Sequence, residues 1–372
     1  MKSLPVAIGL VALLAVGAVL TSGGSQTDSA RQRYLPASNS LRTVSRYGTA
    51  STVTVRSLGE ADAVHPDPRW LAAARPLGPS APDWARRMYA QSLLVLHALT
   101  DRRTGAVLAG ARDGWAYVWP RDASAVAIAL AAAGYRSEAR RVVGFLRGLA
   151  LGAAARFRPD GTPVDGRDAQ GDAAGWIAAA AGAAGLPSAT AERRWRGLDD
   201  YQENGSGDFL ANAIASGAPH VRAQFETPSG TLSRGAGDPG SGLDSAAAWA
   251  VRPFPHPALY PLVRRTLLRL AAGSGRFGIL PSEDWDGGND PWTAPTAWTA
   301  WSLAALGERH AALHLMAELR RAATQVGMLP ERVDARTGVP TSTTPLAWSH
   351  AFAVLALREL WPRTASISTP SR

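Results

Sequence analysis

Apolar residues recur about every three to four positions in a series of segments between residues 83 and 361, and this spacing most constrains the fold. A strand would instead alternate apolar and polar residues, so the spacing predicts an all-α domain. We expect helices over 83–100, 122–133, 137–149, 171–184, 208–225, 243–250, 257–271, 295–306, 309–325 and 346–361. Residues 191–201 fit an eleventh helix.

Long loops rich in Gly, Pro, Asp and Trp separate these helices, at 104–121, 157–170, 227–242, 275–294 and 328–345. Loops of this length inside a compact domain are usually functional. Because the aromatic and acidic residues fall in alternate loops, the pattern suggests helical hairpins arranged in a ring, although helix count alone also fits other α folds. No strict repeat is visible, which disfavours a solenoid.

The first eighty residues have a different character. Lys2, an apolar run over 6–20 and a small polar exit are typical of an export signal or an uncleaved signal anchor, which we place at 1–28. Residues 29–80 resemble a linker or short extension in which only 51–58 alternates like a strand. We therefore expect one folded domain over 81–363, a disordered tail over 364–372, and a protein that is secreted or anchored outside the cytoplasm through 6–20.

Composition narrows the function. The chain is 46% hydrophobic and 19% charged, as is ordinary for a globular protein. Its net charge of +9 comes from arginines scattered along the chain, with Lys2 the single lysine, so no dense basic run points to nucleic acid. The lack of cysteine excludes disulfides and thiolate metal sites.

Three familiar motifs are incomplete or missing. The segment GAGDPG at 235–240 fits G-x-G-x-x-G, but it has no preceding strand and no acidic residue about 20 positions later, so we interpret it as a flexible loop. The segment HAALH at 310–314 lacks the glutamate of a zinc protease, and its histidines are expected on a helix surface. No G-x-S-x-G nucleophile elbow occurs.

Acidic residues share the loops with tryptophan. Glu203, the pair Glu283–Asp284 and Glu331 are the main carboxylates there, and each alone is more often a solvated side chain or a helix cap. The chain has 13 Trp against 7 Tyr and 7 Phe, and several lie in loops: Trp115, Trp119, Trp285 and Trp292. Indoles stack on the apolar faces of sugars. Paired carboxylates are what glycosidic cleavage needs, one to protonate the leaving oxygen and one to activate water or attack carbon.

Four segments resemble glycoside hydrolase family 15, the glucoamylases, glucodextranases and related bacterial enzymes. They are TGAVLAG…YVWPRDAS at 104–124, QGDAAGW at 170–176, DGGNDPWTAPTAW at 286–298 and LPERVDARTGVP…PLAWSHA at 329–351. The resemblance runs over about 84–360, and its first and last segments are specific. It implies an (α/α)6 barrel of six outer and six inner helices, as in the six-hairpin glycosidases, with no metal or cofactor required for the chemistry.

The resemblance also implies two catalytic glutamates. Glu331 would be the general base that activates water. Glu203 would be the general acid, although Gln202 stands where the family commonly has tryptophan; Glu226 is the second candidate for this role. Because these enzymes invert the anomeric centre, the two carboxyl groups should lie roughly 6.5–9.5 Å apart.

For substrate binding, the resemblance implies a subsite for a terminal glucose formed by these residues: Trp119, Arg121, Asp122, Trp292, Trp348 and His350. Arg121 and Asp122 would bind the hydroxyls of that sugar. The family commonly has an arginine before the acidic pair of the 283–290 loop, but residues 278–284 contain none. Either Arg276 reaches into the subsite, or the sugar is held differently.

These observations together predict an exported inverting hydrolase that releases terminal glucose from an α-glucoside or oligosaccharide, without a nucleic-acid partner. Two alternatives stay open. The missing tryptophan and arginine favour a weakened relative that binds glycans at the cell envelope without cleaving them. A trehalase-type activity on the same scaffold is the other.

Overall fold

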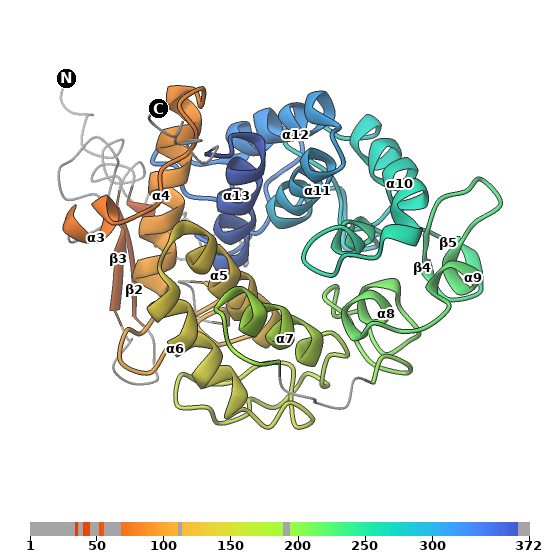
Figure 1. The fold of residues 1–372 in the computed structure, drawn as a ribbon, viewed down its shortest axis with the longest axis horizontal. Coiled ribbons are helices and arrows are strands. Elements are labelled where there is room, and N and C mark those ends of the chain that lie inside the picture. The colour runs from red at the N-terminus through yellow and green to blue at the C-terminus, as the bar shows by residue number, and fades with distance from the viewer. Residues whose placement is uncertain are drawn as a thin grey trace, which may run out of the picture.

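The computed structural model describes residues 68–110, 114–188 and 194–363, together with three short strands nearer the N-terminus (Figure 1). Strands β1 (Tyr34–Leu35), β2 (Ser40–Val44) and β3 (Thr52–Val55) form an antiparallel sheet in that order, and β3 lies inside the predicted strand over 51–58. The predicted export segment over 6–20 and the tail over 364–372 lie outside the described residues. Within the described residues, no helix is both long and apolar enough to cross a membrane.

Helices make up most of the remaining structure. They are α3 (Pro68–Ala72), α4 (Asp83–Leu99), α5 (Pro120–Ala133), α6 (Arg136–Arg147), α7 (Ala173–Ala183), α8 (Leu210–Ser216), α9 (Val221–Phe225), the 3-10 helices η1 (Ser245–Ala250) and η2 (Pro257–Leu259), α10 (Tyr260–Ala272), α11 (Thr293–Ala305), α12 (Arg309–Ala322) and α13 (Ala347–Leu360).

Six of the described elements form a closed inner ring, in which each packs against the next: α5, α7, α8, η1, α11 and α13, with α13 closing the ring against α5 (Figure 1). Helices α4, α6, α10 and α12 lie outside it. Burial follows this division. Nearly every residue of α5 is buried, whereas α6 buries one stripe, Ala139, Val142, Val143 and Leu146, at the spacing of an amphipathic helix. The predicted (α/α)6 barrel is confirmed.

The loops that precede the inner helices meet at one end of this ring. Isolated β-bridges join them in pairs: Gly110 with Leu346, Val118 with Phe157, Gln170 with Asp199, and Trp292 with Arg332. Each bridge connects loops that are far apart in sequence, such as the loop before α5 and the loop before α13. The aromatic and acidic loops of the sequence therefore form one continuous rim.

Edge-to-face aromatic rings fill the centre of the barrel. The Trp249 ring lies 5.1 Å from Trp176 and 5.4 Å from Trp298, at interplanar angles of 85° and 75°. Tyr201 packs on the same cluster, 5.3 Å from Trp298, and its hydroxyl donates to Asp244 at 2.6 Å. Such pairs stabilise a core beyond simple burial. The cluster therefore supports the segment that contains Glu203.

Three predicted elements differ in the structure. The helix over 208–225 is two short helices, because Gly217 ends α8 in a left-handed conformation (φ 69°) and Pro219 follows. Residues 243–250 form η1 rather than an α-helix, and residues 194–201 are turns and bridges, while 191–193 lie outside the described residues. The GAGDPG segment, expected as a flexible loop, lies in a hairpin of β4 (Ser233–Gly235) and β5 (Asp238–Leu243).

Helices α7 and α8 approach closely at Gly175, where an added Cβ would lie 1.9 Å from the Ala215 carbonyl oxygen. We expect Gly175→Ala to lower the free energy of unfolding by about 2 kcal/mol, because neither backbone can yield without disturbing the ring. The control is Gly182→Ala on the same helix, where nothing lies within 4 Å and alanine should be neutral or stabilising. Chemical denaturation of both variants measures this, and equal midpoints would contradict close packing at Gly175.

Candidate active site

A cavity of about 340 Å³ opens at the rim, large enough for a small sugar. Its described lining contains Ala109, Gly114, Trp115, Trp119, Arg121, Asp122, Arg156, Arg167, Tyr201, Gln202, Glu203, Asn204, Trp285, Trp292, Glu331, Arg332, Leu346 and Trp348. We call this cavity the rim pocket. Both predicted catalytic glutamates line it, although they are separated by more than a hundred residues of sequence.

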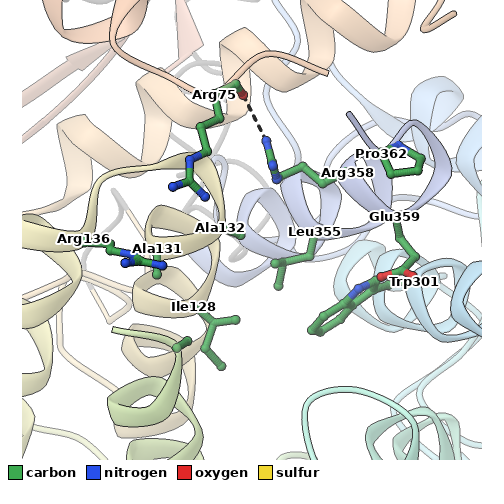
Figure 2. Close-up of a pocket in the computed structure, with 11 residues that line it drawn as sticks. Arg75, Ile128, Ala131, Ala132, Arg136, Trp301, Leu355, Arg358, Glu359 and Pro362 are labelled. Atoms are coloured by element: carbon green, nitrogen blue, oxygen red, sulfur yellow. Dashed lines mark hydrogen bonds between the residues drawn. The ribbon is translucent and has the colours of Figure 1, made fainter. Parts of the chain in front are cut away.

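A second cavity lies at the opposite ends of the inner helices (Figure 2). Ile128 of α5, Leu355 of α13 and Trp301 of α11 form its apolar wall, and Figure 2 shows Arg358 donating to the Arg75 carbonyl oxygen at 3.0 Å. Glu359 is the one carboxylate among its described lining residues. Arg358 lies in the last turn of α13, where a positive charge matches the helix dipole. This cavity lacks the carboxylate pair, so we place the chemistry in the rim pocket.

Glu331 is fixed by the loop before α13. Its backbone N–H donates to the Thr343 carbonyl at 2.9 Å, and its side chain accepts hydrogen bonds from the Ser342 hydroxyl and, at 3.4 Å, from Trp115 Nε1. Burial raises the pKa of the Glu331 carboxyl above its ordinary value. The Ser342 hydrogen bond and the Arg332 charge oppose this rise, and the negative charge of Glu203 adds to it.

Glu203 lies on the loop before α8 and accepts hydrogen bonds from three donors. Trp119 Nε1 donates at 2.8 Å, Gln170 Nε2 at 3.3 Å, and the Arg167 guanidinium forms an ion pair. The backbone of Glu203 is left-handed, with φ 57°, which is uncommon for a residue with a side chain. Strain of this kind persists where the surroundings fix a residue, as in active sites. The packing of Tyr201 in the aromatic core and the hydrogen-bond donors around Glu203 together hold this carboxylate in the rim pocket.

Arg121 and Asp122 begin α5 at the floor of the pocket. The Arg121 guanidinium is buried, donates to Gln170 at 2.7 Å and to Asp172 at 3.2 Å, and lies over the Trp348 ring at 4.7 Å. Asp122 lies 3.4 Å from the same guanidinium. A buried charge requires such partners, so Gln170 and Asp172 hold the arginine in place.

Several polar atoms of the pocket form no hydrogen bond within the described protein. They include Asp122 Oδ2, Arg121 Nε, Arg156 Nε, Arg332 Nε, and the indole N–H groups of Trp285, Trp292 and Trp348. Unsatisfied buried polar groups are costly, and each requires an explanation. Acceptors and donors gathered around one cavity match a ligand with several hydroxyl groups.

Burial also acts on Asp122. It raises the pKa of this carboxyl from 3.8 to about 7, against the opposing effect of Arg121, and the negative charges of Glu203 and Asp172 add to the rise. Asp122 therefore changes charge near neutrality. In either state it can bond a hydroxyl, as an acceptor when ionised or as a donor when protonated.

His350, expected at the substrate, does not line the pocket. It is fully buried in α13, where its Nε2 accepts the Leu329 N–H at 2.9 Å and its Nδ1 lies 2.9 Å from the Ser92 hydroxyl. Burial lowers the pKa of His350 to about 3, so the ring stays neutral and can accept that hydrogen bond. His350 thus positions the backbone of the loop that carries Glu331.

Two further expectations are corrected by geometry. Glu226, the second candidate for the acid, forms an exposed ion pair with Arg222 beside α9 and is not among the lining residues. Arg276 lines a separate cavity with Glu283 and packs over Phe277, so it does not reach into the rim pocket.

The sequence reasoning missed three arginines of the pocket: Arg156, Arg167 and Arg332. Arg332 follows Glu331 in the LPER segment and could have been found there. Arg156 and Arg167 come from the loop before α7, where arginines are common and nothing in the local pattern sets them apart. The positioning residues Gln170 and Asp172 were visible only as part of the QGDAAGW segment.

No group of three or more His, Asp or Glu side chains among the described residues is arranged to hold a metal ion. In the HAALH segment on α12, His314 pairs with Glu318 at 3.0 Å. The histidine pair is therefore part of a helix surface, as the sequence predicted.

Comparison with known proteins agrees with this architecture. The family model described as glycosyl hydrolases family 15 matches residues 83–152, which include the YVWPRDAS segment. No curated protein sequence matches the chain.

Solved structures share the fold. A glycosidase superposes with a TM-score of 0.63 at 21% identity, over 79% of this chain and 99% of its own. A bacterial glucoamylase complexed with acarbose gives 0.61 at 17% identity, over 78% of this chain and 57% of its own. The glucoamylase of Saccharomycopsis fibuligera gives 0.58 at 13% identity, over 74% of this chain and 94% of its own.

The fold is therefore the (α/α)6 barrel of the glucoamylases. The family match and the shared fold confirm the resemblance to glycoside hydrolase family 15 that the sequence motifs predicted, and the chain has the architecture of these glycosidases.

The raised pKa of Asp122 gives a prediction for Asp122→Asn. Between about pH 4 and pH 7 the unfolded chain ionises this carboxyl while the native protein keeps its proton, so native stability falls as pH rises. Asparagine avoids this loss. We expect the variant to gain about 2–4 kcal/mol relative to the parent protein between pH 4 and pH 8, measured by urea unfolding, while sugar binding weakens. A stability difference that does not change with pH would contradict the titration of Asp122 in this range.

Proposed function

We propose that the protein is an inverting glycoside hydrolase that acts outside the cytoplasm and releases terminal glucose from an α-glucoside. The observation that carries the proposal is the placement of Glu203 and Glu331 in one pocket that also contains buried polar atoms without a hydrogen bond to the protein. Glucoamylases of the same fold include one complexed with acarbose, and a variant of the similar glycosidase was solved in complex with glucose.

In the proposed reaction, Glu331 removes a proton from a water molecule whose oxygen attacks the anomeric carbon. Glu203 donates a proton to the glycosidic oxygen, the bond from that oxygen to the anomeric carbon breaks, and the aglycone leaves. The products are glucose of inverted configuration and the free alcohol. Trp115 and Ser342 fix the orientation of Glu331, and Trp119 that of Glu203.

The floor of the pocket supports an exo-acting enzyme. Arg121 and Asp122 are nearly inaccessible, with 4% and 7% of their side chains exposed, and the Arg121 guanidinium lies over the Trp348 ring. A sugar bound there can extend only toward the rim, so its far end must be a chain terminus. This geometry favours recognition of a terminal residue over cleavage within a long chain.

A glycan-binding protein without activity is the second candidate, and the ion pair between Arg167 and Glu203 favours it. A general acid must carry a proton on the oxygen that faces the leaving group. In the described arrangement Arg167 occupies Glu203 Oε2, while Trp119 and Gln170 donate to Oε1. Cleavage therefore requires that Arg167 move from this position.

Substrate release separates the two candidates. The purified protein should hydrolyse at least one of maltose, maltotriose, isomaltose and trehalose, with β-glucose appearing first by NMR. Glu331→Gln and Glu203→Gln should each lower kcat at least about 1000-fold while the chain stays folded and binds the sugar, because each removes a proton-transfer group. Glu226→Gln is the matched control and should keep full activity.

Sugar binding without release of glucose would favour the binding protein instead. The appearance of α-glucose first would exclude the inverting mechanism.

The pH profile provides a separate measurement on Glu331. As the pH is lowered, Glu331 becomes protonated and kcat/KM should fall. Because burial raises the pKa of Glu331, this fall should begin at a higher pH than an ordinary glutamate would give. The Ser342 hydroxyl opposes this rise, so Ser342→Ala should move the acid limb to still higher pH. Thr341→Val, which removes a hydroxyl bonded to Asp290 instead, is the control. A limb that moves to lower pH in Ser342→Ala would show that another group controls it.

A further inference from the structure

The rim pocket holds more positive than negative side chains. Four arginines line it, at positions 121, 156, 167 and 332, against the three carboxylates of Asp122, Glu203 and Glu331. Arg121 is compensated by Asp122 and Asp172 on the pocket floor. The other three arginines share the pocket with only two carboxylates, Glu203 and Glu331, so one positive charge on that side has no negative counterpart in the lining.

Arg156 carries a charge without an anionic partner. Its guanidinium lies 5.1 Å from the centre of the Tyr117 ring and 5.7 Å from that of Trp119, so the faces of two aromatic rings hold it. Within the described residues no carboxylate forms an ion pair with it, and its Nε is buried without a hydrogen-bond partner. Arg156 and Arg167 line the same part of the pocket, because Arg156 lies over the Trp119 ring and both Trp119 and Arg167 bond Glu203. Burial and the charge of Arg167 lower the pKa of Arg156, and the charges of Glu203 and Tyr117 oppose this.

Arg167 has the opposite arrangement, since its guanidinium is paired with Glu203. The pair is accessible from the rim: 36% of the Arg167 side chain and 18% of the Glu203 side chain are exposed, against 4% for Arg121. A general acid faces the leaving group, so Arg156 and Arg167 lie on the leaving-group side of the cleaved bond. Two neighbouring guanidinium groups at this position form a site for an anion.

We propose that the preferred substrate is an α-glucoside whose leaving group carries an anionic substituent, a carboxylate or a phosphate, which binds Arg156 and Arg167 and so releases Glu203 from its ion pair. The inference rests on the proposed hydrolase function and specifies its substrate class. The anion becomes the negatively charged partner of Arg167 in place of Glu203. Glu203 can then take up a proton from water and donate it to the glycosidic oxygen.

A neutral leaving group lacks this effect. It would have to separate Arg167 from Glu203 without offering the guanidinium another anion, and a ligand shifts such an equilibrium only by its differential affinity for the two states. The ion pair therefore disfavours neutral glucosides. An anionic leaving group is favoured because it replaces Glu203 as the partner of Arg167. Gln202, which stands where the family commonly has tryptophan, takes no part in this exchange of ion pairs, because its side chain bonds to Tyr201 and Ser282.

Maltobionate and maltitol provide a matched pair of probes. Both carry α-linked glucose on an open-chain leaving group, and they differ in a carboxylate against a hydroxymethyl group. In the full chain with Glu331→Gln, calorimetry should show maltobionate binding about tenfold more tightly than maltitol, with the preference decreasing as salt is added. α-Maltose 1-phosphate, compared with maltose, tests phosphate as the anion and shows which anion the site prefers.

Arginine variants test the assignment. In the same background, Arg167→Gln and Arg156→Gln should each bring the maltobionate preference close to one. Arg276→Gln, which removes an equal charge outside the rim pocket, should leave it unchanged. With Glu331 intact, Arg167→Gln should reduce the ratio of kcat/KM for maltobionate over maltitol by at least about fivefold, which a loss of folding alone would not do.

Equal binding of charged and neutral probes, or a preference that survives in Arg167→Gln, would overturn the proposal. Gluconate alone separates this failure from failure of the hydrolase function. If gluconate stabilises the protein against heat in a manner that requires Arg156 and Arg167 while no glucoside is cleaved, the anion site stands and the hydrolase function fails. If maltitol is cleaved as fast as maltobionate, the hydrolase stands and the anion site fails.

Discussion

The buried guanidinium of Arg121 is the interaction on which the rest of the site depends. Arg121 lies in the first turn of α5, and its guanidinium bonds Gln170 and Asp172 from the loop before α7 and lies over Trp348 at the start of α13. A buried charge is tolerated only with such partners, so the packing of α5, α7 and α13 against one another must keep these residues together. Gln170 extends the network, since its amide donates to the Asp200 carbonyl and to Glu203. The position of the proposed acid therefore follows from the packing of the floor.

The two glutamates of the rim pocket differ in what surrounds them. Glu331 has hydroxyl and indole donors, and burial dominates its titration. Glu203 accepts hydrogen bonds from Trp119 and Gln170 and forms an ion pair with Arg167. Its backbone is in a strained, left-handed conformation. Environments this different support the two separate roles, acid and base, that we propose for these carboxyl groups. The ion pair with Arg167 is the reason for our proposal that the role of Glu203 depends on what binds beside it.

Much of the fold could be predicted from the sequence because helical periodicity is a local signal. The α5, α11 and α13 segments begin and end within a few residues of the predicted positions. The prediction failed where backbone conformation overrides periodicity: at Gly217, which divides one predicted helix into α8 and α9, and in the glycine-rich segment that forms the β4–β5 hairpin. Local patterns do not reveal such breaks, since an apolar residue has the same spacing on either side of them.

The sequence by itself determined the helices, the alternation of helix and loop, and the motif residues Arg121, Asp122, Glu203 and Glu331, because residue type and spacing carry that information along the chain. Only the tertiary structure decided which of these side chains share a cavity. It placed His350 behind the Glu331 loop, Glu226 and Arg276 outside the pocket, and Arg156 and Arg167 within it. The physical reason is that a pocket is formed by side chains from loops far apart in sequence, and their meeting depends on the closure of the helical ring.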